Sequence, residues 1–155
     1  MRTIINLFLI FISTTIYSQD YDILKKSDTI YVLFSGKKNE RNLIALQPVH
    51  NYNERWYSFL NFEESLTFFH FKYRSYEDKI ANIVSDVKIV NENFIKKNRA
   101  IIITPRFLKK NNLCKVVAEI LNHNRTIYII DCTEKKEGKI VLYEVSMSTI
   151  CRGDG

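Results

Sequence analysis

Glycine, proline, cysteine and histidine are all scarce in this sequence. Its 155 residues include 4 Gly, 2 Pro, 3 Cys and 3 His. So little glycine and proline excludes a collagen-like chain, and 46% hydrophobic with 26% charged residues excludes intrinsic disorder. Three cysteines are too few for a disulfide-dense miniprotein. What remains is an ordinary globular chain, long enough for one domain with a real hydrophobic core.

Because these residues are scarce, most sequence patterns typical of metal-binding or catalytic sites are absent. No Cys-x-x-Cys, His-x-His or His-Glu-x-x-His spacing occurs, so we expect no metal site and no cofactor. The four glycines stand apart in the sequence, so none forms a phosphate-binding loop. Cys114 and His123 fall nine residues apart on a predicted helix, about 13 Å along its axis. That distance is too long for a thiolate–imidazole pair.

The chain opens with its most apolar run. Arg2 precedes the apolar residues 4–12, polar residues follow, and Ser18 is a small residue suited to cleavage before Gln19. The run is shorter than the roughly 20 residues of a transmembrane helix, and no later stretch is apolar enough to span a bilayer. We therefore expect a secretory signal peptide over 1–18 and an exported product, periplasmic or secreted, without a transmembrane segment. The Ile-, Lys- and Asn-rich composition is typical of a secreted bacterial protein.

Short runs bounded by turn signals predict strands in the first half of the remaining chain. The predicted strands are 29–34, 42–47, 55–60 and 66–74, and the last alternates most regularly. Short, turn-rich links separate them, and such links join antiparallel neighbours. We therefore expect an antiparallel meander.

The second half combines strands with helices. The continuously apolar runs 100–104 and 126–131 predict strands buried on both faces. Between them, apolar residues at helical spacing predict a helix over 113–122, which Asn112 would cap. The whole segment 100–131 has the length of a single βαβ unit. The same pattern fits a helix on an antiparallel sheet, so the relative direction of the two strands stays open.

These predictions combine into one α+β domain over 19–155. We expect a mostly antiparallel sheet with one or two helices packed on a face, the second helix falling at about 76–86. The strand 139–146 after the loop at 133–138 completes a C-terminal β-hairpin. The residues from about 149 form a flexible tail.

All three cysteines, Cys114, Cys132 and Cys151, lie in the part expected to be exported, where disulfides persist. The sequence does not select a pairing. For Cys114 we favour the interpretation that it is a small buried apolar residue beside the core stripe of its helix.

Aromatic and basic residues together suggest a ligand surface. Trp56, His70, Lys72 and Arg74 fall on two neighbouring predicted strands, where an aromatic ring could stack on a ligand and cations could contact an anionic group. The competing interpretation is that the aromatics of these strands only fill a core. Removal of the signal peptide takes away Arg2 and lowers the net charge from +6 to +5, so nearly all the excess of basic residues lies in the exported domain.

The partner expected from this charge is an anionic envelope polymer or another envelope protein. Nucleic acid is not expected, because an exported protein rarely meets it. With no catalytic constellation in the sequence, we expect a non-catalytic binding or structural domain of the cell envelope or extracellular space. The alternative is a small exported hydrolase whose site is assembled from separate strands.

Overall fold

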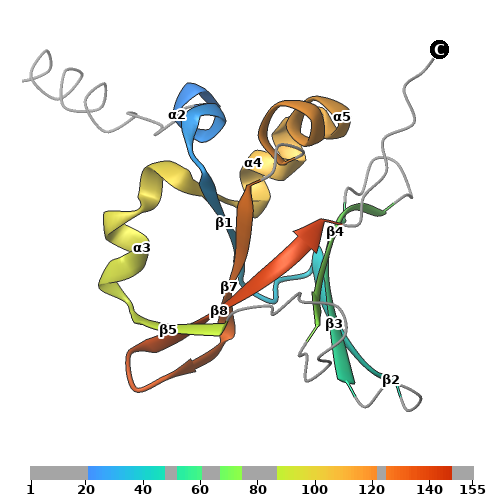
Figure 1. The fold of residues 1–155 in the computed structure, drawn as a ribbon, viewed down its shortest axis with the longest axis vertical. Helices are drawn as coiled ribbons and strands as arrows, with labels where there is room; N and C mark the ends of the chain where they lie inside the picture. The colour runs from blue at the N-terminus through green and yellow to red at the C-terminus, as the bar shows by residue number, and fades with distance from the viewer. Residues whose placement is uncertain (1–20, 48–51, 61–66, 75–86, 122–124, 148–155) are drawn as a thin grey trace, which may run out of the picture.

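The computed structural model describes residues 21–47, 52–60, 67–74, 87–121 and 125–147 (Figure 1). Several predictions fall outside these ranges. They are the signal peptide over 1–18 with its cut between Ser18 and Gln19, the helix at about 76–86 and the tail from about 149.

Within the described residues the chain is α+β and dominated by strands, as predicted. The elements in chain order are α2 (Tyr21–Lys26), β1 (Thr29–Phe34), β2 (Glu40–Gln47), β3 (Tyr52–Leu60), β4 (Thr67–Arg74), β5 (Val87–Asn91), α3 (Asn93–Lys97), η1 (Arg99–Ile101), β6 (Ile102–Ile103), α4 (Pro105–Lys110), α5 (Leu113–Val116), η2 (Val117–Leu121), β7 (Thr126–Lys136) and β8 (Lys139–Met147). None of the described helices combines the length and hydropathy needed to cross a membrane.

The strands form one mixed, curled sheet. Their order is β2-β3-β4-β8-β7-β1-β6, and β5 pairs with part of β8. The described pairing between β4 and β8 consists of Phe71 with Met147 and Lys72 with Ser146. This narrow junction divides the sheet into an outer part, β2–β4, and a central part, made of β1 and β5–β8. Figure 1 shows the outer part diverging from the central strands.

The sheet is not the four-strand meander expected over 29–74. β2, β3 and β4 run antiparallel in succession, but β1 lies between β6 and β7 and is parallel to both. The physical reason is that β1 is covered on both faces. Ile30, Val32 and Phe34 enter one core cluster, while Tyr31 and Leu33 pack against a second. Strands that lie between parallel neighbours are usually covered on both faces in this way.

The strands expected to frame a βαβ unit are both present, but they are not neighbours. β6 and β7 are each parallel to β1, which separates them. The helical segment between β6 and β7 therefore leads from one side of β1 to the other. β6 has two residues, because η1 occupies 99–101 and α4 begins at Pro105.

Capping interactions fix where these helices begin. The Thr104 hydroxyl accepts a hydrogen bond from the Phe107 amide at 3.2 Å, and Pro105 occupies the first turn of α4. The predicted cap at Asn112 is also present, since its side-chain oxygen accepts from the Lys115 amide at 3.1 Å. The helix expected over 113–122 is observed as α5 followed by a π-helical turn, η2.

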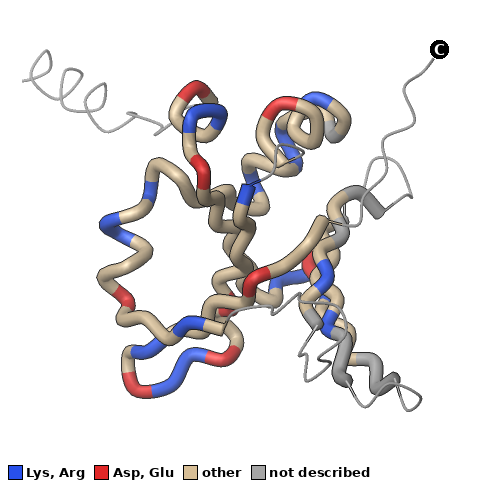
Figure 2. The backbone as a smooth tube through the Cα atoms, viewed as in Figure 1, with Lys and Arg blue, Asp and Glu red and all other residues tan. Residues whose placement is uncertain are grey.

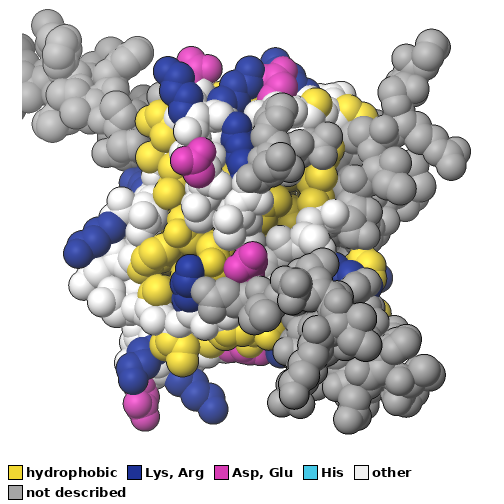
Figure 3. All heavy atoms as spheres, viewed as in Figure 1, with side chains coloured by type: hydrophobic (Ala, Val, Ile, Leu, Met, Phe, Trp, Pro, Cys, Tyr) yellow, Lys and Arg dark blue, Asp and Glu magenta, His cyan; other side chains and the backbone are white. Residues whose placement is uncertain are grey.

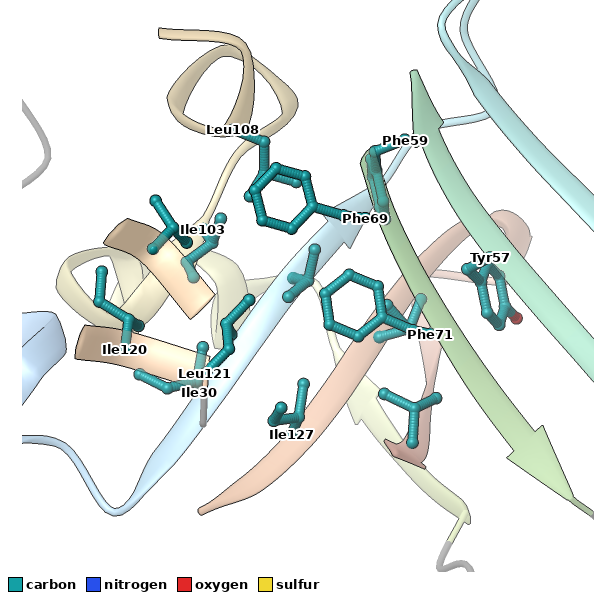
Figure 4. Packing of buried hydrophobic residues seen from close by; sticks show 14 of the residues in the cluster. Ile30, Tyr57, Phe59, Phe69, Phe71, Ile103, Leu108, Ile120, Leu121 and Ile127 are labelled. Atoms are coloured by element: carbon teal, nitrogen blue, oxygen red, sulfur yellow. The ribbon is translucent and has the colours of Figure 1, made fainter. Parts of the chain in front are cut away.

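Two core clusters cover opposite faces of the central sheet. The main core joins β1 and β7 to the inner face of β3 and β4 and to α2, α4, α5 and η2 (Figure 4). The second core lies on the other face of β1 and β7, where Phe94 and Ile95 of α3 pack against it. Helices therefore cover both faces, rather than the single face expected. Central strands covered on both sides explain the continuously apolar sequence of β7 from Ile127 to Ile130.

Candidate functional site

Two of the four predicted binding residues lie in contact. Trp56 of β3 pairs in register with Lys72 of β4, and the Lys72 ammonium nitrogen lies 4.7 Å from the centroid of the Trp56 ring. Both side chains are half-buried. A cation–π contact at such a site contributes about 0.5–1 kcal/mol. The pair thus holds an aromatic ring and a positive charge next to each other on the sheet.

The register extends this pair into a row across four strands. Leu43 of β2 pairs with Trp56, and Ser146 of β8 pairs with Lys72. Residues directly opposite in a sheet point to the same face, so the four side chains form one row, here called the outer row. Leu43 is 64% exposed and Ser146 is exposed. The row lies on the opposite face from the aromatic core residues of the same strands.

His70 and Arg74 flank Lys72 along β4. In register, His70 pairs with Ser58 and Arg74 pairs with Glu54. The structure describes the backbone of His70 and Arg74 but not their side chains. Their contribution to a ligand surface stays a prediction. Leu43 was not among the predicted binding residues, because the run 43–46 is continuously apolar and does not mark one exposed face.

Charges are spread widely around this region. Figure 2 shows Lys and Arg on helices, loops and strands, with both signs at the tip of the β7–β8 hairpin. Figure 3 shows hydrophobic side chains visible between scattered charged ones on one face of the molecule. On β2, Arg41 is exposed two residues before Leu43, which adds a second cation close to the outer row.

The inner side of the same strands carries a buried polar cluster. Asp131 of β7 is 0% exposed and accepts a hydrogen bond from the Tyr57 hydroxyl at 2.8 Å. Its other oxygen accepts from the Thr133 amide at 2.9 Å and from the Thr133 hydroxyl. Burial raises the pKa of Tyr57 well above its usual value, although the hydrogen bond from Arg55 opposes that shift.

Arg55 extends this cluster to the β7–β8 hairpin. Its Nη1 lies 3.7 Å from Asp131 Oδ2 and 2.5 Å from Glu134 Oε1, and its guanidinium lies 4.7 Å from the centroid of the Tyr143 ring. The Tyr143 hydroxyl donates to Glu134. Burial, followed by that hydrogen bond, raises the pKa of Tyr143. Both carboxylates are engaged in these contacts, so the cluster connects β3 to β7 and to the β7–β8 hairpin.

The cysteines are in different states. Cys132 is a free, half-buried thiol, and Cys114 is disulfide-bonded. Burial raises the pKa of Cys132, and the charges of Asp131 and Glu40 raise it further, so its thiolate is disfavoured. The favoured interpretation of Cys114 as an unpaired apolar residue is therefore wrong. Cys151 lies outside the described residues.

Comparisons with known proteins add no relationship. No protein-family model matches the chain, and no curated protein or solved structure matches it. Within the described ranges, no group of three or more His, Cys, Asp or Glu residues could hold a metal ion.

Proposed function

We propose that the chain is a non-catalytic, exported binding domain whose outer row holds an anionic polymer of the bacterial envelope. The observation that carries this proposal is the contact between Trp56 and Lys72 in a partly exposed row on the sheet. An aromatic ring offers a stacking surface, and the adjacent ammonium group offers a counter-charge. The two together suit a polymer that presents sugar rings or other flat groups alongside negative charges.

The shape of the surface favours an extended ligand. Neighbouring strands lie about 4.8 Å apart, so a row across four strands is roughly 14 Å long. Leu43 extends the apolar part of the row beyond Trp56, and Arg41 adds positive charge near that end. The contacts with the polymer would be electrostatic in part, so binding should weaken as salt increases.

Two features support export. The N-terminal sequence predicts a secretory signal peptide, and the chain contains a disulfide-bonded cysteine, Cys114. Disulfides persist in oxidising compartments such as the periplasm and the extracellular space. An anionic envelope polymer has the charge that suits a basic protein in either place.

Retention on an anionic matrix tests this proposal. We would load the purified protein on dextran sulfate and on neutral dextran, and elute it with a salt gradient. Lys72→Ala should elute at clearly lower salt than Lys139→Ala, a matched loss of one charge at an exposed site on the β7–β8 hairpin. Trp56→Leu, which keeps every charge, should also elute earlier. Equal elution of Lys72→Ala and Lys139→Ala would mean that only net charge matters, and the proposal would fail.

A further inference from the structure

A hollow of about 300 Å³ lies on the inner side of β3 and β4, opposite the outer row. The loop after β1 and the start of α4 form its walls. Figure 4 shows Leu108 of α4 beside Phe69 of β4, with Phe59 of β3 close to both. This side of the molecule plays no part in the proposed polymer binding.

The hollow has an apolar floor. Phe59, Phe69 and Leu108 line it and are themselves 2–5% exposed, so their positions are fixed by the core around them. Pro105 adds a further apolar wall at the first turn of α4. A ligand that reaches this floor must bring an apolar group of its own, because the described side chains that form it would not compensate a desolvated polar atom.

The rim of the hollow is cationic. Lys37 and Lys38 come from the loop after β1, and Arg106 and Lys109 come from α4; all four are exposed. The carboxyl ends of the parallel strands β1 and β6 meet at this edge, and the two sets of cations follow those strand ends. Ligands commonly bind outside the carboxyl ends of parallel strands, where the following loops converge.

The acidic residue described in the lining, Glu40, does not cancel this charge at the rim. It is 8% exposed, and its carboxylate accepts hydrogen bonds from the Ser35 amide at 2.5 Å, the Ser35 hydroxyl at 2.8 Å and the Gly36 amide at 3.1 Å. The carboxylate is thus directed at the backbone of the loop. By holding that loop, Glu40 positions Lys37 and Lys38 at the rim.

We propose that this hollow binds a small amphiphilic anion, namely a carboxylate with a short alkyl chain. The alkyl chain would cover Phe59, Phe69 and Leu108, and the carboxylate would face Arg106 and the lysines of the rim. A volume of about 300 Å³ stands at the lower end of the range for ligand pockets, roughly 300–1,000 Å³, and suits one small molecule. The polar head and the apolar tail are therefore both required for binding.

A series of probes tests this requirement without altering the protein. We would follow the backbone amides by NMR while titrating octanoate, octanol and acetate separately. Octanoate should shift the amides of 36–40 and 106–109, while octanol and acetate should bind at least about tenfold more weakly, because each lacks one half of the interaction. Equal binding of octanol and octanoate, or of acetate and octanoate, would overturn the proposal. Octanoate shifts confined to other residues would do the same.

A charge-matched pair of variants locates the site. Arg106→Ala/Lys109→Ala removes two exposed cations from the rim, and Lys96→Ala/Lys97→Ala removes two exposed cations from α3, which covers the other face of the sheet. The first variant should weaken octanoate binding about tenfold or more, and the second should leave it unchanged. Equal weakening of octanoate binding by the two double variants would contradict binding in this hollow. Neither variant alters Trp56 or Lys72. Octanoate binding tests the hollow, and retention on dextran sulfate tests the outer row, so a failure of one proposal can be distinguished from a failure of the other.

Discussion

The Tyr57 hydroxyl donates a hydrogen bond to the fully buried Asp131 across the boundary between the outer and central parts of the sheet. Tyr57 belongs to β3 and Asp131 to β7, two strands that do not pair with each other. This contact and the Arg55 contacts beside it tie together two sheet parts whose described strand pairing is narrow. The relative position of the two parts matters because the hollow lies between β3–β4 and α4.

Tyr57→Phe should destabilise the protein by about 1–3 kcal/mol, because it leaves a buried carboxylate oxygen without its donor. Tyr73→Phe is the matched control, since it removes a hydroxyl from a half-buried tyrosine of the same aromatic group. Urea unfolding of both variants measures the difference. Equal free energies of unfolding would show that the contact with Asp131 does not stabilise the junction.

Stability should fall at high pH. Burial raises the pKa values of Tyr57 and Tyr143 in the folded chain, whereas the unfolded tyrosines titrate near pH 10. The unfolded state then loses its tyrosine protons before the folded state does. The free energy of unfolding therefore keeps its full value below about pH 10 and decreases as the pH rises above it.

The variant Tyr143→Phe isolates one part of this pH dependence. It removes one tyrosine whose pKa is raised, so its free energy of unfolding should decrease less steeply between pH 10 and pH 11 than that of the unaltered protein. Urea midpoints measured near pH 8, 10 and 11 give the slopes. A slope unchanged by Tyr143→Phe would mean that this hydroxyl is not held protonated by the fold.

Gly36 should tolerate a side chain less well than Gly138. Both have positive φ, +68° and +73°, but an added Cβ at Gly36 would lie 2.7 Å from Thr133 Cγ2, whereas at Gly138 the nearest atom would be 3.6 Å away. Gly138→Ala should cost about 1 kcal/mol for the backbone conformation alone. Gly36→Ala should cost about 2–3 kcal/mol, because overlap adds to that cost. Thermal unfolding compares them, and an equal loss for the two variants would contradict the close approach to Thr133.

The cysteine states predict a disulfide between Cys114 and Cys151. The chain has three cysteines, of which Cys114 is disulfide-bonded and Cys132 is free. The denatured, unreduced protein should therefore show one thiol per chain, and peptide mapping should find Cys114 joined to Cys151. Reduction should lower the free energy of unfolding by about 2–4 kcal/mol. Three thiols before reduction would rule the disulfide out.

The sequence predicted local structure better than long-range pairing. The Asn112 cap and the strands buried on both faces follow from nearby residues. The place of β1 between β6 and β7 does not, because a strand that is covered on both faces and a strand in a meander can share the same short apolar sequence. Its partners depend on which helices cover it, and two of these, α3 (Asn93–Lys97) and α4 (Pro105–Lys110), come much later in the chain.

The candidate sites show the same division. The aromatic–basic pattern led to Trp56 and Lys72, because alternation within two neighbouring strands determines both. The Asp131 cluster and the hollow were missed, since each is assembled from strands and helices far apart in the sequence. An aspartate ending the apolar run of β7 was the one local sign of the buried cluster. Nothing local indicates that Lys37 and Arg106 share a rim.

The emission of Trp56 tests the central claim most directly, because it is the single tryptophan of the chain and belongs to the proposed binding surface. Titration with dextran sulfate should change this emission, while neutral dextran should not. The change should require more polymer at high salt, and in Lys72→Ala more polymer than in Lys139→Ala at the same salt. Emission that does not respond to dextran sulfate would contradict polymer binding at the outer row. A response that is weakened neither by Lys72→Ala nor by high salt would contradict it as well.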